Sequence, residues 1–255
     1  MVDHSEGAWL SIALASAQAC RLRLGWLAGL FLVTAVSAAA ADDEAEYAIR
    51  WSATSGATGS ATAVLGLLRK SSGAPQTFQV RYFDVALPAD APAGFTAILR
   101  ERIASSNQPE VTWKYRGGAS PAPGKKKDWR CPLASEAKRK DEADISFLPD
   151  GKVKKVYSRS CTADAALSAA VPSTLSAQPK GCKSTMLRYE STSGGLTVEE
   201  WRQEGGTLVI EVSMKGKDGK PARKAFKSEV VDVLMAAGIK PLDRSKTEIG
   251  SQCGV

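Results

Sequence analysis

Hydrophobic and polar residues alternate with a period of two along much of the chain. Residues 44–51 place Ala45, Tyr47, Ile49 and Trp51 on one side and mostly charged residues on the other. Such alternation indicates a β-strand with one apolar and one polar face. Comparable patterns and turn signals predict eight more strands, at 76–85, 95–103, 111–117, 141–147, 152–160, 183–191, 196–204 and 207–216.

Helical periodicity is confined to two segments. Residues 61–70 predict a short helix, and residues 221–239 predict a longer one with Phe226, Val230, Val233 and Leu234 on one face. Strands and helices do not alternate, which argues against a parallel Rossmann sheet. We therefore expect an α+β fold: mainly an antiparallel β-barrel, closed and tunnel-like, with a few flanking helices.

The first 41 residues have the pattern of a secretory signal peptide. Arg21 and Arg23 precede an uncharged apolar stretch at 24–36, and small residues follow as far as Ala41. The apolar stretch is short for a transmembrane helix, which needs about 20 residues. We expect cleavage near Ala41, a periplasmic or secreted protein without membrane contact, and one domain over 42–255. An uncleaved membrane anchor is the alternative.

Composition narrows the possible chemistry. The single histidine, His4, lies within the predicted signal peptide. An exported chain without histidine excludes Ser-His-Asp and Cys-His nucleophile systems and His-ligated zinc or haem. Removal of residues 1–41 takes away two basic and two acidic side chains, so the net charge of +7 is unchanged. This charge suits an anionic partner, while the missing aromatic-basic surface motif argues against nucleic acid.

Four cysteines follow residue 41, and an even number in an exported chain predicts two disulfides. Three pairings are open. A bond between Cys161 and Cys182 is favoured because they bracket a segment rich in Pro, Ser and Ala, which leaves Cys131 for Cys253. No CxxC spacing occurs, which disfavours a thiol oxidoreductase or a zinc ribbon.

The polar faces of several predicted strands are charged. Arg100 alternates with Arg102, and Lys114 with Arg116. One explanation is an open antiparallel sheet with a solvated face. The other is a barrel with a polar interior, in which Arg and Lys converge on a multiply charged anion. Carboxylates on the same wall would then hold Mg²⁺ or Mn²⁺.

The order of these segments resembles the CYTH superfamily, the triphosphate tunnel metalloenzymes. That family opens with an ExExK strand and continues with YFDT-like and LRxR-like strands and a strand ending in Lys. Later strands carry Arg and Glu, and an ExE strand precedes a closing helix and a Ser-Lys pair. The matching segments here are EAEYAIR at 44–50, RYFDV at 81–85, LRER at 99–102, VTWK at 111–114, LRYE at 187–190, IEVSMK at 210–215 and SK at 245–246.

The resemblance implies a tunnel that binds a triphosphate or polyphosphate together with Mg²⁺ or Mn²⁺. Its metal ligands would be Glu44, Glu46 and Glu211. The opening motif departs from the family because its basic residue comes late, and Ser213 stands where the later motif has a second carboxylate. The anion ligands are better kept and would be Arg50, Arg100, Arg102, Lys114, Arg188, Lys215 and Lys246.

Three functions stay open at this point. The first is a metal-dependent triphosphatase or related hydrolase, for which the sequence assigns no catalytic residue. The second is a non-catalytic module that captures a polyanion in a degenerate tunnel. The third is a structural or interaction protein without a ligand.

Overall fold

The computed structural model describes residues 44–53, 58–91, 93–117, 129–134 and 138–253. The predicted signal peptide lies outside these ranges, so its cleavage and the division of the chain at Ala41 remain predictions. Within the described ranges, no helix combines the length and apolar character needed to cross a membrane.

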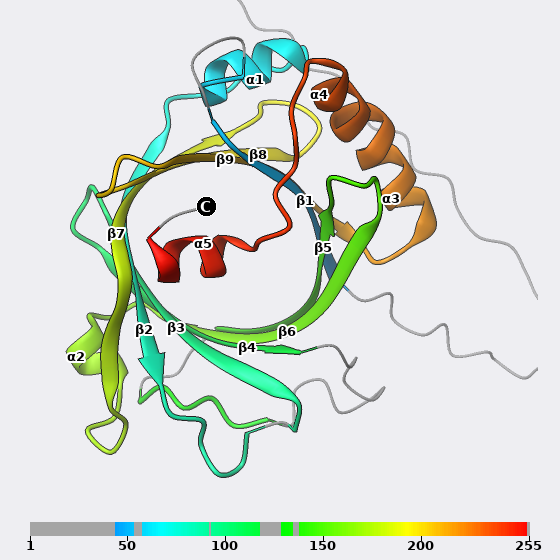
Figure 1. The fold of residues 1–255 in the computed structure, drawn as a ribbon. Helices are drawn as coiled ribbons and strands as arrows, with labels where there is room; N and C mark the ends of the chain where they lie inside the picture. The colour runs from blue at the N-terminus through cyan, green and yellow to red at the C-terminus, as the bar shows by residue number, and fades with distance from the viewer. Residues whose placement is uncertain (1–43, 54–57, 92, 118–128, 135–137, 254–255) are drawn as a thin grey trace, which may run out of the picture. The chain divides into compact units, whose positions relative to one another are not determined.

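Nine strands of the described chain close into a barrel, seen end-on in Figure 1. Neighbouring strands run antiparallel except β1 and β5, which are parallel. The predicted α+β fold with a mainly antiparallel barrel is confirmed. In spatial order the strands are β1 (Glu44–Ser52), β5 (Lys138–Phe147), β6 (Val153–Ala163), β4 (Pro109–Gly117), β3 (Phe95–Ala104), β2 (Gln76–Val85), β7 (Ala177–Glu190), β8 (Leu196–Gln203) and β9 (Leu208–Lys217).

The barrel is apolar outside and largely polar inside. On β1, Tyr47, Ile49 and Trp51 are buried in an outer hydrophobic cluster, whereas Glu46 and Arg50 line an internal cavity. The period of two forces this division, because successive side chains of a strand point to opposite faces. Of the two explanations for the charged strand faces, the barrel with a polar interior is therefore the right one.

Helices cover part of the outer face. Helix α1 (Ala61–Leu67) contributes Val64 and Leu65 to the outer cluster around β1. The helical segment predicted at 221–239 consists of α3 (Lys220–Phe226), a π-helical turn (Lys227–Val231) and α4 (Asp232–Ala236). Phe226, Val230 and Leu234 of this segment are buried and pack onto β1, beside which the helices lie in Figure 1. Val233, predicted on the same face, is 38% exposed, so its place on the buried face is wrong.

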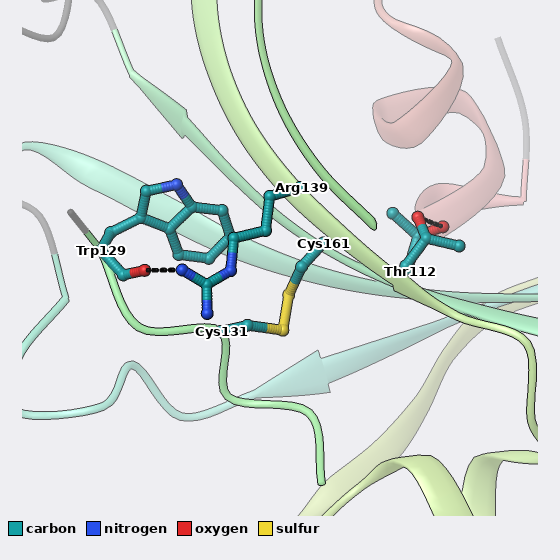
Figure 2. Close-up of a disulfide and its surroundings, with 6 residues drawn as sticks. Thr112, Trp129, Cys131, Arg139 and Cys161 are labelled. Atoms are coloured by element: carbon teal, nitrogen blue, oxygen red, sulfur yellow. Dashed lines mark hydrogen bonds between the residues drawn. A yellow bond between two sulfur atoms is a disulfide. The ribbon is translucent and has the colours of Figure 1, made fainter. Parts of the chain in front are cut away.

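A second outer cluster lies over β4 and β6. Trp113 is fully buried there, and the ring of Trp129 meets Tyr115 edge-on at 5.5 Å. The short helix α2 (Leu167–Ala170) packs against the same cluster. Figure 2 shows how the disulfide between Cys131 and Cys161 fastens the segment around Trp129 to β6.

The described residues contain two disulfides, Cys131–Cys161 and Cys182–Cys253. The favoured pairing of Cys161 with Cys182 is wrong, and so is that of Cys131 with Cys253. The order of strands explains the error: three strands, β4, β3 and β2, lie between β6 with Cys161 and β7 with Cys182.

The C-terminal helix α5 (Lys246–Gln252), absent from the sequence prediction, lies inside the ring of strands (Figure 1). A capping box formed by Ser245 and Glu248 begins it. Ile249 packs into an internal apolar cluster with Tyr82. At Gly250 a Cβ atom would lie 2.3 Å from the ring of Tyr82, so this approach requires glycine. Together with the Cys182–Cys253 bond, these contacts hold α5 in the lumen.

Candidate functional site

A cavity of about 290 Å³ occupies the barrel lumen beside α5. Every strand of the barrel contributes to its lining, together with residues 245–247. Among the described residues, nine basic and five acidic side chains line it, which leaves an excess of four positive charges. The basic ones are Arg50, Arg100, Arg102, Lys114, Arg116, Lys140, Arg188, Lys215 and Lys246; the acidic ones are Glu46, Glu142, Asp144, Glu199 and Glu211.

All seven residues predicted to bind the anion line this cavity. Of the predicted metal ligands, Glu46 and Glu211 also line it, but Glu44 does not. The side chain of Glu44 is 71% exposed, and its carboxylate lies 3.8 Å from the ammonium of Lys140. The structure thus brings nine of the ten predicted site residues together, while their roles remain predictions.

Three carboxylates in the lumen form an acidic cluster, defined here as Glu46, Glu142 and Asp144. One oxygen of each lies within 4.8 Å of the others. Glu142 and Asp144 are missing from the sequence prediction, although they alternate along β5 in the way that marks a lumen-facing pair. Parallel pairing of β1 with β5 sets Glu46 beside Asp144.

The acidic cluster is a suitable site for a hard divalent cation. Carboxylate oxygens are the ligands that Mg²⁺ and Mn²⁺ prefer. Its charge is partly balanced by neighbouring cations, because Lys114 lies 3.4 Å from Glu142 and 3.1 Å from Asp144. Arg116 lies 2.9 Å from Asp144, and Lys140 forms an ion pair with Glu142.

Glu46 is expected to stay ionised down to about pH 2. Burial raises its pKa, but the charges of Lys246, Lys114 and Lys140 outweigh this effect and lower the pKa from 4.5 to about 2. Because the folded pKa lies below the unfolded one, Glu46 stabilises the fold fully above about pH 4.5, and this contribution is lost as the pH falls towards 2. An NMR titration of the Glu46 carboxyl carbon checks this, and a midpoint near 4.5 would contradict it.

Two guanidinium groups share one carboxylate on the β3–β4 side of the lumen. Nε of Arg102 donates a hydrogen bond to Glu110 at 2.9 Å, while Arg100 lies 3.8 Å from the same carboxylate. Repulsion from Arg100, followed by burial, lowers the pKa of Arg102. Nε of Arg100 is buried and has no hydrogen-bond partner among the described residues. This pair has positive charge left for an anion.

On the opposite side of the lumen, Lys246 forms ion pairs with Glu199 of β8 and Glu211 of β9. The ammonium of Lys246 lies 2.7 Å from Glu199 and 2.6 Å from Glu211. Nε of Arg50 lies 2.7 Å from the other oxygen of Glu211. Burial lowers the pKa of Lys246, but these carboxylates outweigh it and raise the pKa well above its usual range. Lys246 is thus an ammonium ion at any physiological pH.

Glu199 and Glu200 show how neighbouring carboxylates on one strand separate. Glu199 lines the cavity, whereas Glu200 accepts a hydrogen bond from the backbone of Ala61 at the start of α1. Only one of the two therefore belongs to the lumen.

No protein-family model and no curated protein matches the chain. One similar solved structure is the PH1819 protein of Pyrococcus horikoshii OT3, at 14% identity and a TM-score of 0.43, covering 80% of this chain and 97% of that one. Another is a proposed adenylate cyclase from Vibrio parahaemolyticus, at 11% identity and a TM-score of 0.40, covering 82% and 97%. Similarity this low shows neither a family nor an activity.

Proposed function

We propose that this is an exported CYTH-like protein whose barrel lumen binds a triphosphate- or polyphosphate-type anion. The observation that carries the proposal is the convergence of nine basic side chains on one cavity with an excess of positive charge. Phosphate oxygens are strong acceptors for Arg and Lys, and charge-assisted hydrogen bonds are the strong ones. A small anion with several charges suits an enclosed, cation-rich space of this size.

The anion is held mainly by basic side chains whose positive charge is not fully balanced by carboxylates. Arg100 and Arg102 share one carboxylate, and Lys215 takes part in none of the ion pairs found among the described residues. Lys215 is exposed at one edge of the cavity. Arg188 and Lys114 complete the proposed contact set from β7 and β4.

A divalent cation, Mg²⁺ or Mn²⁺, is proposed at the acidic cluster of Glu46, Glu142 and Asp144. These three carboxylates would hold the ion, which would supply positive charge to offset that of the anion. Lys114 is in contact with both Glu142 and Asp144 and faces the same cavity. It can therefore hold an anion oxygen close to the cation.

Hydrolysis of the bound anion is a second candidate function, favoured by the acidic cluster next to the basic groups. Phosphoryl transfer depends on positioning and on charges aimed at the transferred group. The basic side chains supply that charge, and non-catalytic capture is the alternative. The two disulfides support a periplasmic or secreted site of action, since such bonds persist in oxidising compartments.

The test is a titration of the purified, disulfide-intact protein with tripolyphosphate, with and without Mn²⁺, alongside an assay of phosphate release. We expect micromolar binding that weakens as salt is raised. Release of phosphate only with metal would support the hydrolase, and binding without release would contradict it. Absence of binding would overturn both functions.

A further inference from the structure

Glu199 and Glu211 face each other directly across β8 and β9. Their side chains are only 7% and 1% exposed. Like charges directly opposite on neighbouring strands repel each other, and buried charges need partners. The pair therefore requires a cation between its members.

Lys246 supplies that cation from α5. Its ammonium contacts one oxygen of each carboxylate, at 2.7 and 2.6 Å. The remaining bonds fix the carboxylates in place: Arg50 holds the second oxygen of Glu211, and the indole N–H of Trp201 donates to Glu199 at 3.0 Å. Two converging carboxylates with fixed orientation form an oxygen-ligand set of the kind that divalent cations occupy.

We propose that the Lys246 ammonium is a built-in cation that fills a cation site between Glu199 and Glu211. The side chain keeps Mg²⁺ or Mn²⁺ out of this position, and its removal opens the position to a divalent ion. The lumen of the native protein then takes one divalent cation, at the acidic cluster. The expected number of one divalent cation in the native protein rests on the proposed function. The prediction that a cation site opens between Glu199 and Glu211 when Lys246 is removed does not.

This assignment gives Lys246 and Glu211 roles different from those that the family resemblance implies. The charge of Lys246 is balanced by two carboxylates and is not available to the anion. The charge of Glu211 is balanced by Arg50 and Lys246. The same contacts dock the first residue of α5 against β8 and β9. A divalent ion at this position and a docked Lys246 exclude each other.

The experiment counts Mn²⁺ ions bound per chain, from the electron paramagnetic resonance signal of free Mn²⁺ and from calorimetry. The native protein, Lys246→Ala and Lys152→Ala are compared. Lys152→Ala is the control, because it removes the same charge from an exposed turn, where the side chain is 79% exposed and does not line the cavity. We expect one ion in the native protein, two in Lys246→Ala and one in Lys152→Ala.

The possible outcomes separate this inference from the proposed function. No ion in the native protein and one in Lys246→Ala would overturn the metal at the acidic cluster and support the built-in cation. The same number of ions in Lys246→Ala as in the native protein, or two in the native protein, would overturn the built-in cation.

Lys246→Ala leaves two opposed carboxylates and could fail to fold without metal. In that case Mn²⁺ is expected to restore its native circular dichroism during refolding, because the ion replaces the missing charge. Lys246→Met, which keeps the aliphatic stem, serves as the second variant and is again expected to bind one ion more than the native protein. Failure of Mn²⁺ to rescue Lys246→Ala, with no extra ion in Lys246→Met, would overturn the inference.

Discussion

An Arg100→Ala/Arg102→Ala double variant loses about 100-fold to 10,000-fold in affinity for tripolyphosphate. Each charged hydrogen bond contributes about 1.5–3 kcal/mol, and about 1.4 kcal/mol corresponds to a factor of ten. The two guanidinium groups share one carboxylate, that of Glu110. The positive charge and N–H donors that Glu110 leaves unused are therefore expected to bind the anion. Calorimetric titration with tripolyphosphate measures the loss directly.

A Lys152→Ala/Lys227→Ala variant is the matched control. It removes the same charge from the β5–β6 turn and from the helical segment outside the barrel, where the two side chains are 79% and 50% exposed. Exposed charges act weakly across screened distances, so the affinity should change by less than about threefold. An equal loss in both variants would mean that tripolyphosphate binds to surface charge and not in the lumen.

Removal of the bond that tethers α5 has the largest expected effect on stability. Cys182 and Cys253 are separated by 71 residues, and closing a loop of this length stabilises the fold by about 4 kcal/mol in the chain-entropy model. The Cys182→Ser/Cys253→Ser variant should therefore lose about 4 kcal/mol in unfolding free energy. For a domain of this size the Tm should fall by about 8–16 °C. Urea and thermal denaturation measure both quantities.

A Cys131→Ser/Cys161→Ser variant separates general destabilisation from release of α5. Its loop spans 30 residues, which predicts a similar loss of about 3.5 kcal/mol. Only the Cys182→Ser/Cys253→Ser variant should show faster amide hydrogen exchange at 246–252 than the native protein under strongly native conditions. Unchanged exchange there would show that Lys246 and Ile249 hold α5 without the covalent bond.

Alternation along single strands is local, and the sequence predicts it well. The positions of Arg50, Arg100 and Lys114 on the polar faces of their strands follow from the period of two alone. Once those faces turn into a lumen, the same residues converge without further information. This is why most of the predicted anion ligands meet in one cavity.

Features that depend on which strands become neighbours are not visible in such a pattern. The acidic cluster forms because β1 pairs in parallel with β5, four strands later in the chain. The disulfides likewise follow the spatial order of strands, which cysteine spacing does not encode. Helix α5, in contrast, has a local sequence signal, because Ser245 and Glu248 match the capping-box pattern that begins a helix.

Pairing of β1 with both β5 and β9 has a consequence for how the molecule is made. The ring closes only when Glu44 meets Lys217, near the two ends of the barrel sequence. Such long-range pairing requires loss of loop-closure entropy before the stabilising contacts form. Folding is therefore expected to be slow compared with that of helical bundles. Until closure, open strand edges are available to other chains. We therefore expect chains in which β9 is not yet paired to aggregate more readily than the closed barrel.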